Sequence, residues 1–299
     1  MSDTRDMQVS IIIPVYNEEK AIGSVIDKIN EVMQKSAYAY EIIIVDDCST
    51  DGTARIVESK QVRLLRRHRR GGSGAARKTG IRNAEGEIIV MVDGDGTYDY
   101  SDIPEMLKLF PEYDQIIGAR TSEQGYWRPL RAFAKKIICE LASYLSKTHI
   151  PDLNSGLRAF KRDIMKKFLW AIPDGFSCVS SMTIAFLCDG YAVKWIPTRY
   201  FPRIGKSKFN PLSDTYNYVL TVIRLIMYFN PLRIFLPLSF ILLSIGIIKS
   251  IADRFFFLGR MQLSDIVLIL TALLVGILGL LADLIVAQGR LLRSQDERG

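Results

Sequence analysis

Histidine and cysteine are scarce in this chain of 299 residues, which holds two histidines and four cysteines. The cysteines stand singly, without a Cys-x-x-Cys pair, and the two histidines lie far apart in the sequence. A structural zinc site needs closely spaced thiolate or imidazole ligands, so this pattern excludes one. Scattered single cysteines are also typical of proteins from a reducing compartment.

Two further features are missing: a secretory signal and a nucleic-acid-binding motif. Met1 to Gln8 is polar and charged, without the apolar core of a signal peptide, so we expect the N-terminal domain to stay in the cytoplasm. The net charge is +7. Because the chain has no zinc-finger spacing and no RNP-type aromatic run, we expect no nucleic acid as partner. The positive charge fits an anionic membrane surface or phosphorylated ligands better.

Apolar runs rich in β-branched residues alternate with helical patterns in the first hundred residues. The predicted strands are Val9 to Ile13, Glu41 to Val45, Val62 to Leu65 and Glu87 to Val92, and the predicted helices are Glu18 to Met33, Asp51 to Val57 and Ala75 to Ala84. Continuous apolar strands are typical of a sheet that is buried on both faces. The sequence therefore predicts an α/β domain with an open, mostly parallel, Rossmann-like sheet.

Polar residues follow three of these strands directly. Pro14 and Tyr16 follow the first, Asp47 follows the second, and Asp93 and Asp95 follow the fourth. In open α/β sheets, ligands bind beyond the carboxyl ends of the strands. We therefore expect these residues to converge on one ligand site.

Asp93 and Asp95 are the candidate metal ligands. Two carboxylates one residue apart on a turn can bind a hard cation such as Mg²⁺ or Mn²⁺, which in turn can bridge a diphosphate. Such an ion would neutralise charge on a departing nucleoside diphosphate. An ordinary acidic turn would have the same composition, so the argument depends on the position at the end of a buried strand.

Two loops supply further candidates. The turn from Gly71 to Gly74 leads into the helix that carries Lys78, and a helix start can bind phosphate, although a simple tight turn explains the glycines equally well. Asp152 lies in a loop after a helical pattern and could act as a general base or hold a sugar hydroxyl. Taken alone, Asp152 could equally be a helix cap or a turn residue.

Most of the apolar excess lies after Phe229, in two long runs. We expect these runs to form a transmembrane hairpin with spans at about 231–252 and 265–287, since a span needs roughly 20 mostly apolar residues. Lys249 interrupts the first span and can snorkel. Lysine and arginine are dense before the first span and after the second, which places both termini in the cytoplasm. Gly276 and Gly279 would allow close helix packing and leave a homo-oligomer open.

The segment between the sheet and the spans is amphipathic. Residues 127–145 and 211–229 interleave apolar and basic positions at helical spacing, which predicts helices at the membrane interface. The predicted organisation is a cytoplasmic catalytic domain at 1–210, a juxtamembrane helix at 211–229, and the hairpin with a short tail at 230–299.

Four motifs in order resemble glycosyltransferase family 2. They are VSIIIPVYNE at 9–18, VDDCSTDGT at 45–53, MVDGDGTY at 91–98 and NSGLR at 154–158. Together with the two spans and the basic run 203–208, they are similar to the polyprenyl-phosphate glycosyltransferases, which act on dolichyl or undecaprenyl phosphate. The resemblance implies a GT-A fold and inverting transfer of a sugar from a nucleoside-diphosphate sugar to a polyprenyl phosphate at the cytoplasmic membrane face.

The resemblance also implies roles for individual residues. Pro14, Tyr16 and Glu18 match the segment that lies against the nucleoside, and Asp47 matches the aspartate that reads the base. Asp93 and Asp95 match the carboxylates that bind the nucleotide and the metal. The cations that would receive the acceptor phosphate and the diphosphate are matched by Arg120, Arg131, Arg203 and Lys208. Asp152 matches an acidic residue proposed as base or sugar-orienting group. Thr97 stands where some relatives have glutamine as a further metal ligand, so the third ligand is not assigned.

The acceptor's chemistry bears on the role of Asp152. A lipid monophosphate has a second pKa of about 6 and is largely a dianion at neutral pH, so it scarcely needs a base. It does need cations that bring two polyanions together, and arginines suit this task. We therefore favour a positioning role for Asp152.

Two alternatives remain. A processive polysaccharide synthase would resemble the first half, but it carries a Gln-x-x-Arg-Trp motif, whereas Gln124 to Arg128 has a different order, and two spans are few for a polymer channel. A non-catalytic, membrane-anchored nucleotide-binding partner would have no need of the intact carboxylates.

Overall fold

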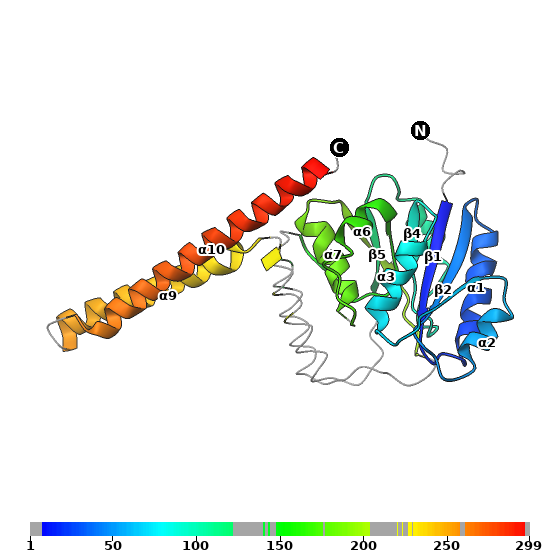
Figure 1. Cartoon of the computed structure of the whole chain (residues 1–299), viewed down its shortest axis with the longest axis horizontal. Helices are drawn as coiled ribbons and strands as arrows, with labels where there is room; N and C mark the ends of the chain where they lie inside the picture. The colour runs from blue at the N-terminus through cyan, green and yellow to red at the C-terminus, as the bar shows by residue number, and fades with distance from the viewer. Residues whose placement is uncertain are drawn as a thin grey trace. The chain divides into compact units, whose positions relative to one another are not determined.

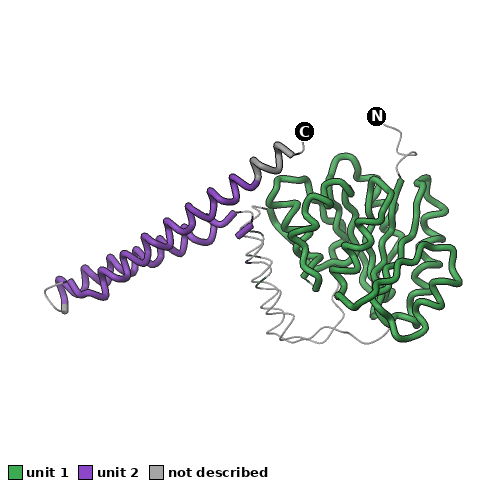
Figure 2. Tube along the Cα trace, in the orientation of Figure 1, with its two compact units in different colours: residues 1–222 green, residues 223–299 purple. Residues whose placement is uncertain are grey.

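The computed structural model describes residues 8–121, 140, 143, 148–175, 177–203, 220, 223, 227–228, 230–257 and 261–296. The chain divides into two compact units, residues 1–222 and 223–299 (Figure 2). The predicted boundaries at 210 and 230 lie on either side of this division. Most residues of the predicted amphipathic interface helices lie outside the described residues.

The first unit alternates strands and helices along the chain from its first strand to its fifth (Figure 1). Its strands are β1 (Gln8–Val15), β2 (Ala39–Asp46), β3 (Arg63–Arg66), β4 (Ile88–Met91), β5 (Gln115–Arg120), β6 (Arg158–Lys161) and β7 (Val193–Thr198). Its helices are α1 (Ile22–Gln34), α2 (Thr53–Glu58), α3 (Ser73–Asn83), α4 (Asp102–Leu107), α6 (Arg162–Phe168) and α7 (Cys178–Cys188).

Within the described residues, the strands form one seven-stranded sheet in the order β3-β2-β1-β4-β6-β5-β7. Only β6 runs antiparallel to its neighbours, β4 and β5. The other pairs are parallel, which confirms the mostly parallel sheet that the sequence predicts. The strand order reverses on either side of β1, so the β1/β4 edge is the topological switch point at which ligands bind in such sheets.

Helices cover both faces of this sheet. The helices α3, α6 and α7 contact one another on one face, and α1 contacts α2 and α4 on the other (Figure 1). The core between β1 and α1 consists of fully buried aliphatic side chains, among them Ile11, Ile13, Ile22 and Ile26. Gly80 of α3 lies directly against Ile12, where a β-carbon would overlap, so this helix packs closely on the sheet.

The loop after β1 is longer than the sequence predicts, because α1 begins at Ile22 rather than at Glu18. The main-chain N–H of Asn17 donates to Ser49 Oγ at 3.0 Å, and the N–H of Glu18 donates to Thr53 Oγ1 at 2.8 Å. Asn17 has a positive φ of 53°. These hydrogen bonds hold residues 16–21 against the loop after β2 and thereby keep Tyr16 and Glu18 at the strand ends.

The second unit contains the two long apolar helices. They are α9 (Leu232–Ala252), which continues into a π-helical turn (Asp253–Phe257), and α10 (Leu263–Asp296). Leu232–Phe256 and Leu263–Gly289 are long and apolar enough to cross a membrane, and only 11% and 17% of their most apolar windows are buried. The core helices of a soluble protein would be mostly buried, so this confirms the two apolar C-terminal helices that the sequence predicts. That they span a membrane stays a prediction.

Gly276 and Gly279 of α10 face α9. A β-carbon on Gly279 would overlap Phe235, and one on Gly276 would lie 3.0 Å from Ser239 Oγ. Ser239 Oγ also donates to the carbonyl of Ala272 at 2.8 Å. Gly276 and Gly279 therefore bring α9 and α10 together within one chain, and they supply no separate argument for an oligomer.

Lys249 lies near the connection between the two helices, in a small polar cluster. Its Nζ donates to Asp253 at 2.8 Å, to Ser264 at 3.0 Å and to the fully buried Asp265 at 2.5 Å. Its charge is thus compensated within the hairpin, which explains how a lysine is accommodated in an otherwise apolar span.

Candidate active site

The predicted strand-end residues gather at the carboxyl edge of the sheet. β1 and β2 end side by side, with Val15 paired to Asp46, and Asp47 N donates to the carbonyl of Val15 at 3.0 Å. β4 lies on the other side of β1, and Asp93 follows it. Pro14, in β1, is half-buried and pairs with Val45.

Asp93 is held by a buried arginine from α3. Arg77, only 5% exposed, donates from Nη2 to Asp93 Oδ1, and its Nη1 lies 3.4 Å from Cys178 Sγ. On the other side, the backbone of Gly156 is so close to the Asp93 carboxylate that a β-carbon would overlap it. The carboxylate is therefore fixed in orientation on two sides. Arg77 was not predicted as a site residue, although its place in a helix that begins with a glycine-rich turn could have suggested it.

Asp95 is 7% exposed and lies beside a buried threonine. Thr97 donates to Asp95 Oδ1 from its hydroxyl at 2.7 Å and from its main-chain N–H at 3.2 Å. Burial raises the pKa of Asp95, and the neighbouring charge of Asp93 raises it further. Thr97 thus orients the aspartate, at the position where the resemblance suggested a further metal ligand.

Arg203 bridges Asp95 to the predicted nucleoside segment. Its Nη2 donates to Glu18 Oε1 at 2.6 Å, and its Nη1 lies 3.5 Å from Asp95 Oδ2. Three site residues that are distant in sequence are therefore brought together. Arg131 and Lys208, the other predicted cations, lie outside the described residues.

Asp47 is buried, and its carboxylate accepts hydrogen bonds from its own chain. Arg67 Nη1 donates to Oδ1 at 2.5 Å, and the main-chain N–H groups of Gly71 and Gly72 donate at 3.0 Å and 2.7 Å. Gly72 has a φ of 91°, which favours glycine. Asp47 thus fixes the basic loop that follows β3, a contact that the sequence does not reveal.

The ring of Tyr16 stacks against the side chain of Arg70. The guanidinium carbon of Arg70 lies 4.1 Å from the ring centroid, a cation–π distance. Arg70 belongs to the same basic loop that Asp47 holds. The basic loop thus contacts both Tyr16 and Asp47, two residues that the resemblance assigns to the nucleoside.

Lys78 contacts the segment around Asp174. Its Nζ lies 2.5 Å from Asp174 Oδ1 and donates to the carbonyl of Ile172 at 3.0 Å. The carbonyl of Asp174 also accepts from the N–H groups of Gly74 and Ala75, at 2.8 Å and 3.2 Å. The first turn of α3 is therefore capped by the chain itself, which favours the tight-turn interpretation of the glycines over phosphate binding.

Asp152 and Arg120 form a fork. Arg120 donates from Nε to Asp152 Oδ2 at 2.7 Å and from Nη2 to Oδ1 at 3.0 Å. Oδ1 also accepts from the N–H of Asn154 at 3.0 Å, and the carboxylate is 3% exposed. The Arg120 guanidinium in turn lies 5.4 Å from the ring centroid of Tyr200. This geometry favours a positioning role for Asp152 over a base, because both oxygens already accept hydrogen bonds.

Arg158, at the end of the NSGLR motif, is fully buried. It donates to the carbonyls of Ser155 and Val179, each at 2.5 Å, and to Thr183 Oγ1 at 3.1 Å. Burial and the charge of Arg77 lower the pKa of Arg158 to about 10, so the guanidinium stays charged at neutral pH. Arg158 ties the loop that contacts Asp93 to α7.

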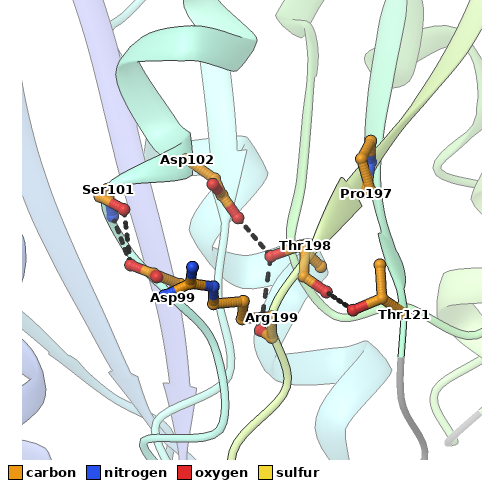
Figure 3. Close-up of a pocket in the computed structure, with 7 residues that line it drawn as sticks. All are labelled: Asp99, Ser101, Asp102, Thr121, Pro197, Thr198 and Arg199. Atoms are coloured by element: carbon orange, nitrogen blue, oxygen red, sulfur yellow. Dashed lines mark hydrogen bonds between the residues drawn. The ribbon is translucent and has the colours of Figure 1, made fainter.

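A hollow of about 480 Å³ lies between the start of α4 and the ends of β5 and β7 (Figure 3). It is lined by Asp99, Ser101, Asp102, Thr121, Pro197, Thr198 and Arg199. Thr198 donates its hydroxyl to Asp102, which lies within the same hydrogen-bonded group (Figure 3). No site residue predicted from the sequence lines this hollow.

The residues at the end of β4 fit a divalent cation. Asp93 and Asp95 supply two oxygen-bearing side chains, and burial together with the neighbouring charge of Asp93 raises the pKa of Asp95. A guanidinium already lies near Asp95 Oδ2, so the position attracts cations. Among the described residues, no group of three or more His, Cys, Asp or Glu side chains gathers into a ready-made metal cage. Water and the diphosphate itself would have to complete the coordination, as is usual for Mg²⁺.

The fold and this arrangement define an α/β protein of the GT-A type, with carboxylates at the switch point of its sheet. The family model described as Glycosyl transferase family 2 matches residues 10–169, and the model described as GtrB C-terminal hairpin matches residues 230–287. The chain belongs to glycosyl transferase family 2.

Two curated relatives match this chain over more than two thirds of its length. Glycosyltransferase AglJ of Haloferax volcanii is 27% identical over 293 residues, which cover 94% of this chain and 95% of the relative. The dolichyl-phosphate hexose transferase of the same organism is 28% identical, covering 69% of this chain and 88% of the relative.

Solved structures share the fold. Glucosyl-3-phosphoglycerate synthase from Mycobacterium tuberculosis, in complex with Mn²⁺, UDP and phosphoglyceric acid, superposes with a TM-score of 0.58 at 18% identity, covering 74% of this chain and 78% of that chain. The same enzyme with Mg²⁺ and UDP gives a TM-score of 0.55 at 18% identity, covering 73% and 79%. At this identity the likeness establishes the fold.

Proposed function

We propose that this protein transfers a sugar, with inversion, from a nucleoside-diphosphate sugar to a polyprenyl phosphate at the cytoplasmic face of a membrane. The observation that carries the proposal is the union, in one chain, of a family 2 domain with Asp93 and Asp95 at the switch point and a C-terminal hairpin of the GtrB type. The relatives named as dolichyl- and undecaprenyl-phosphate sugar transferases support the choice of acceptor.

The donor half of the site follows from the strand ends. Tyr16 and the loop around Arg70 would bind the nucleoside, while Asp93 and Asp95 would hold Mg²⁺ or Mn²⁺ beside the diphosphate. The ion would supply charge neutralisation for the departing diphosphate. Arg77 and Gly156 keep Asp93 in place, and Thr97 does the same for Asp95.

The acceptor half follows from the arginines. A lipid phosphate that is mostly a dianion at neutral pH attacks without a base, so the protein's task is to orient it and to offset its charge. Arg120, held rigid by Asp152, presents a guanidinium that does not lose its proton and therefore leaves the attacking oxygen anionic. Arg203, whose Nη1 lies 3.5 Å from Asp95 Oδ2, would add a second positive charge for the acceptor phosphate and the diphosphate.

The hairpin would keep the domain at the source of its lipid substrate. Both termini would face the cytoplasm, because lysine and arginine are dense before the first span and after the second. A single cysteine placed at the tip between the spans, in a cysteine-free chain, is expected to react with an impermeant thiol reagent only from the outer side. Labelling from the cytoplasmic side would overturn this topology.

The reaction is tested with the full chain in detergent or lipid, a panel of labelled nucleoside-diphosphate sugars, and polyprenyl phosphate. The expected result is a labelled product of monosaccharide size in the organic phase, formed only with divalent metal. The Asp95→Asn variant is expected to insert in membranes normally and to form no product. Full activity of this variant with metal chelated would contradict the metal assignment.

The products also separate the alternatives. A water-soluble polymer would indicate a processive synthase, and the absence of any product across the panel, with donor binding intact, would indicate a non-catalytic partner. Either result would overturn the proposed reaction.

A further inference from the structure

The guanidinium of Arg203 joins two carboxylates that belong to the donor side of the site. It lies 2.6 Å from Glu18 Oε1 and 3.5 Å from Asp95 Oδ2. The side chains of Glu18 and Asp95 are each 10% exposed, whereas that of Arg203 is 30% exposed. A partly buried arginine thus lies between two largely buried carboxylates.

The other contacts of Asp95 leave one oxygen for a cation. Thr97 occupies Oδ1 through its hydroxyl and its N–H, and Arg203 approaches Oδ2. Among the described residues, the Nε of Arg203 is buried and has no hydrogen-bond acceptor. An optimal arginine–carboxylate ion pair is bidentate, with two N–H groups of the guanidinium donating to one carboxylate. Arg203 instead divides its donors between two carboxylates, so its ion pairs are not optimal.

We propose that Arg203 fills the cation position at Asp95 in the unloaded protein, and that binding of the divalent metal displaces Arg203 toward the acceptor phosphate. This inference rests on the proposed function, since it assumes a metal at Asp95 and a phosphate acceptor. A metal ion would lie about 2.0–2.6 Å from its oxygen ligands. At that distance from Asp95 Oδ2, it would come within a few ångströms of the guanidinium, and the two cations would repel each other.

The displacement would order the reaction. Before the metal arrives, Arg203 is bound to Glu18 and Asp95 and is unavailable to the lipid phosphate. Once the metal has taken Asp95, Arg203 retains only Glu18, and a phosphate dianion competes better for it. Metal and acceptor are therefore expected to bind with positive coupling, and such coupling is reciprocal.

The test measures Mn²⁺ binding to the full chain by electron paramagnetic resonance of free Mn²⁺, with no nucleotide sugar present. The Arg203→Gln variant is expected to bind Mn²⁺ at least about threefold more tightly than the wild type, because the competing cation is gone. The matched control is Arg199→Gln, which removes the same charge from an exposed position four residues earlier. It is expected to change the affinity by less than about twofold, since exposed charges are screened by salt.

A second measurement adds the acceptor. A short-chain polyprenyl phosphate is expected to tighten Mn²⁺ binding in the wild type and to have no such effect in Arg203→Gln. Thermal unfolding of each variant confirms that it is folded, and Arg203→Lys, which cannot bridge both carboxylates, is expected to fall between wild type and Arg203→Gln.

The outcomes separate this inference from the proposed function. Equal or weaker Mn²⁺ binding by Arg203→Gln, with a wild type that binds Mn²⁺ and transfers sugar, would overturn the displacement alone. An equal gain in Arg199→Gln would also overturn it, because the effect would then be general electrostatics. A wild type that neither binds Mn²⁺ nor forms product would overturn the proposed function as well.

Discussion

Arg120 grips Asp152 with two arms of its guanidinium, at 2.7 Å and 3.0 Å, and the carboxylate is almost fully buried beneath it. Trp195 Nε1 donates to the main-chain carbonyl of Asp152 at 3.0 Å, so the aspartate is fixed through its backbone as well. Asp152 therefore orients the guanidinium of Arg120, and we expect Asp152 to affect activity by positioning Arg120.

A double-mutant cycle tests this dependence. Asp152→Asn is expected to lower kcat/KM in the wild-type background and to have little further effect once Arg120→Gln is present. For residues in direct contact the coupling free energy is about 0.5–3 kcal/mol. Steady-state kinetics with the lipid acceptor varied measures it. Strictly additive losses would show that Asp152 acts on the substrate independently of Arg120.

Gly156→Ala is predicted to weaken metal binding at the donor site by displacing Asp93. The added methyl group would overlap the Asp93 carboxylate and force it away from its present position. Disturbing a group that orients a metal ligand typically costs about 10–100-fold in metal affinity or activity. The matched control is Gly175→Ala, whose β-carbon would meet nothing within 4 Å. Equal Mn²⁺ affinity in both variants would contradict the contact with Asp93.

Asp102 gives a prediction for the pH dependence of stability. Burial raises the pKa of Asp102, and this outweighs the hydrogen bond from Thr198, which lowers it. The folded protein therefore keeps the proton to a higher pH than the unfolded chain, in which an aspartate has a pKa of about 3.9. As pH rises from about 3.9 through the raised pKa, ionisation of Asp102 lowers the free energy of unfolding.

Asp102→Asn removes this ionisation and keeps an oxygen to accept from Thr198. The variant is expected to gain in thermal unfolding midpoint over wild type at pH 7 by more than at pH 4. The control is Asp163→Asn, on a side chain that is 82% exposed. A gain that is the same at both pH values would argue against the raised pKa of Asp102.

Gly279→Val is predicted to destabilise the hairpin. Its side chain would overlap Phe235 of the facing helix, and overpacking of this kind costs about 1–3 kcal/mol. Gly289→Val is the control on the same helix, because a β-carbon there meets nothing within 4 Å. The unfolding midpoint of the full chain in detergent measures both. Unchanged stability of Gly279→Val would contradict close packing at this position.

The strands that carry the donor-side residues could be predicted from the sequence, because each is marked by a local run of apolar, β-branched residues. The runs Val9 to Ile13 and Glu87 to Val92 are apolar and β-branched, so their strands and the residues at their ends could be predicted. The parallel order then required the ends to meet. The two spans were readable for the same reason, as continuous apolar segments.

The strands β5, β6 and β7 could not be predicted from the sequence, because their pairing partners are distant along the chain. β6 has four residues and begins with Arg158, a charged residue that no local pattern marks as buried. Its burial depends on carbonyls of Ser155 and Val179, which only the folded chain brings together.

The same limit applies to the site. The sequence supplied candidate residues but not their partners within the protein. It could not show that Arg67, Gly71 and Gly72 donate to Asp47, or that Lys78 lies against Asp174. Resemblance assigns such positions to ligands, whereas the structure shows which donors in the protein a ligand would have to displace.

The contact between Lys249 and Asp265 has a consequence for how the protein is made. Each helix of the hairpin carries one of the two charges near its connecting end, where an unpaired lysine or aspartate still costs free energy during insertion by the translocon, although less than the cost of about 2.5–3.5 kcal/mol at the centre of a span. The two helices are therefore expected to leave the translocon as a pair, with the ion pair already formed, rather than one after the other.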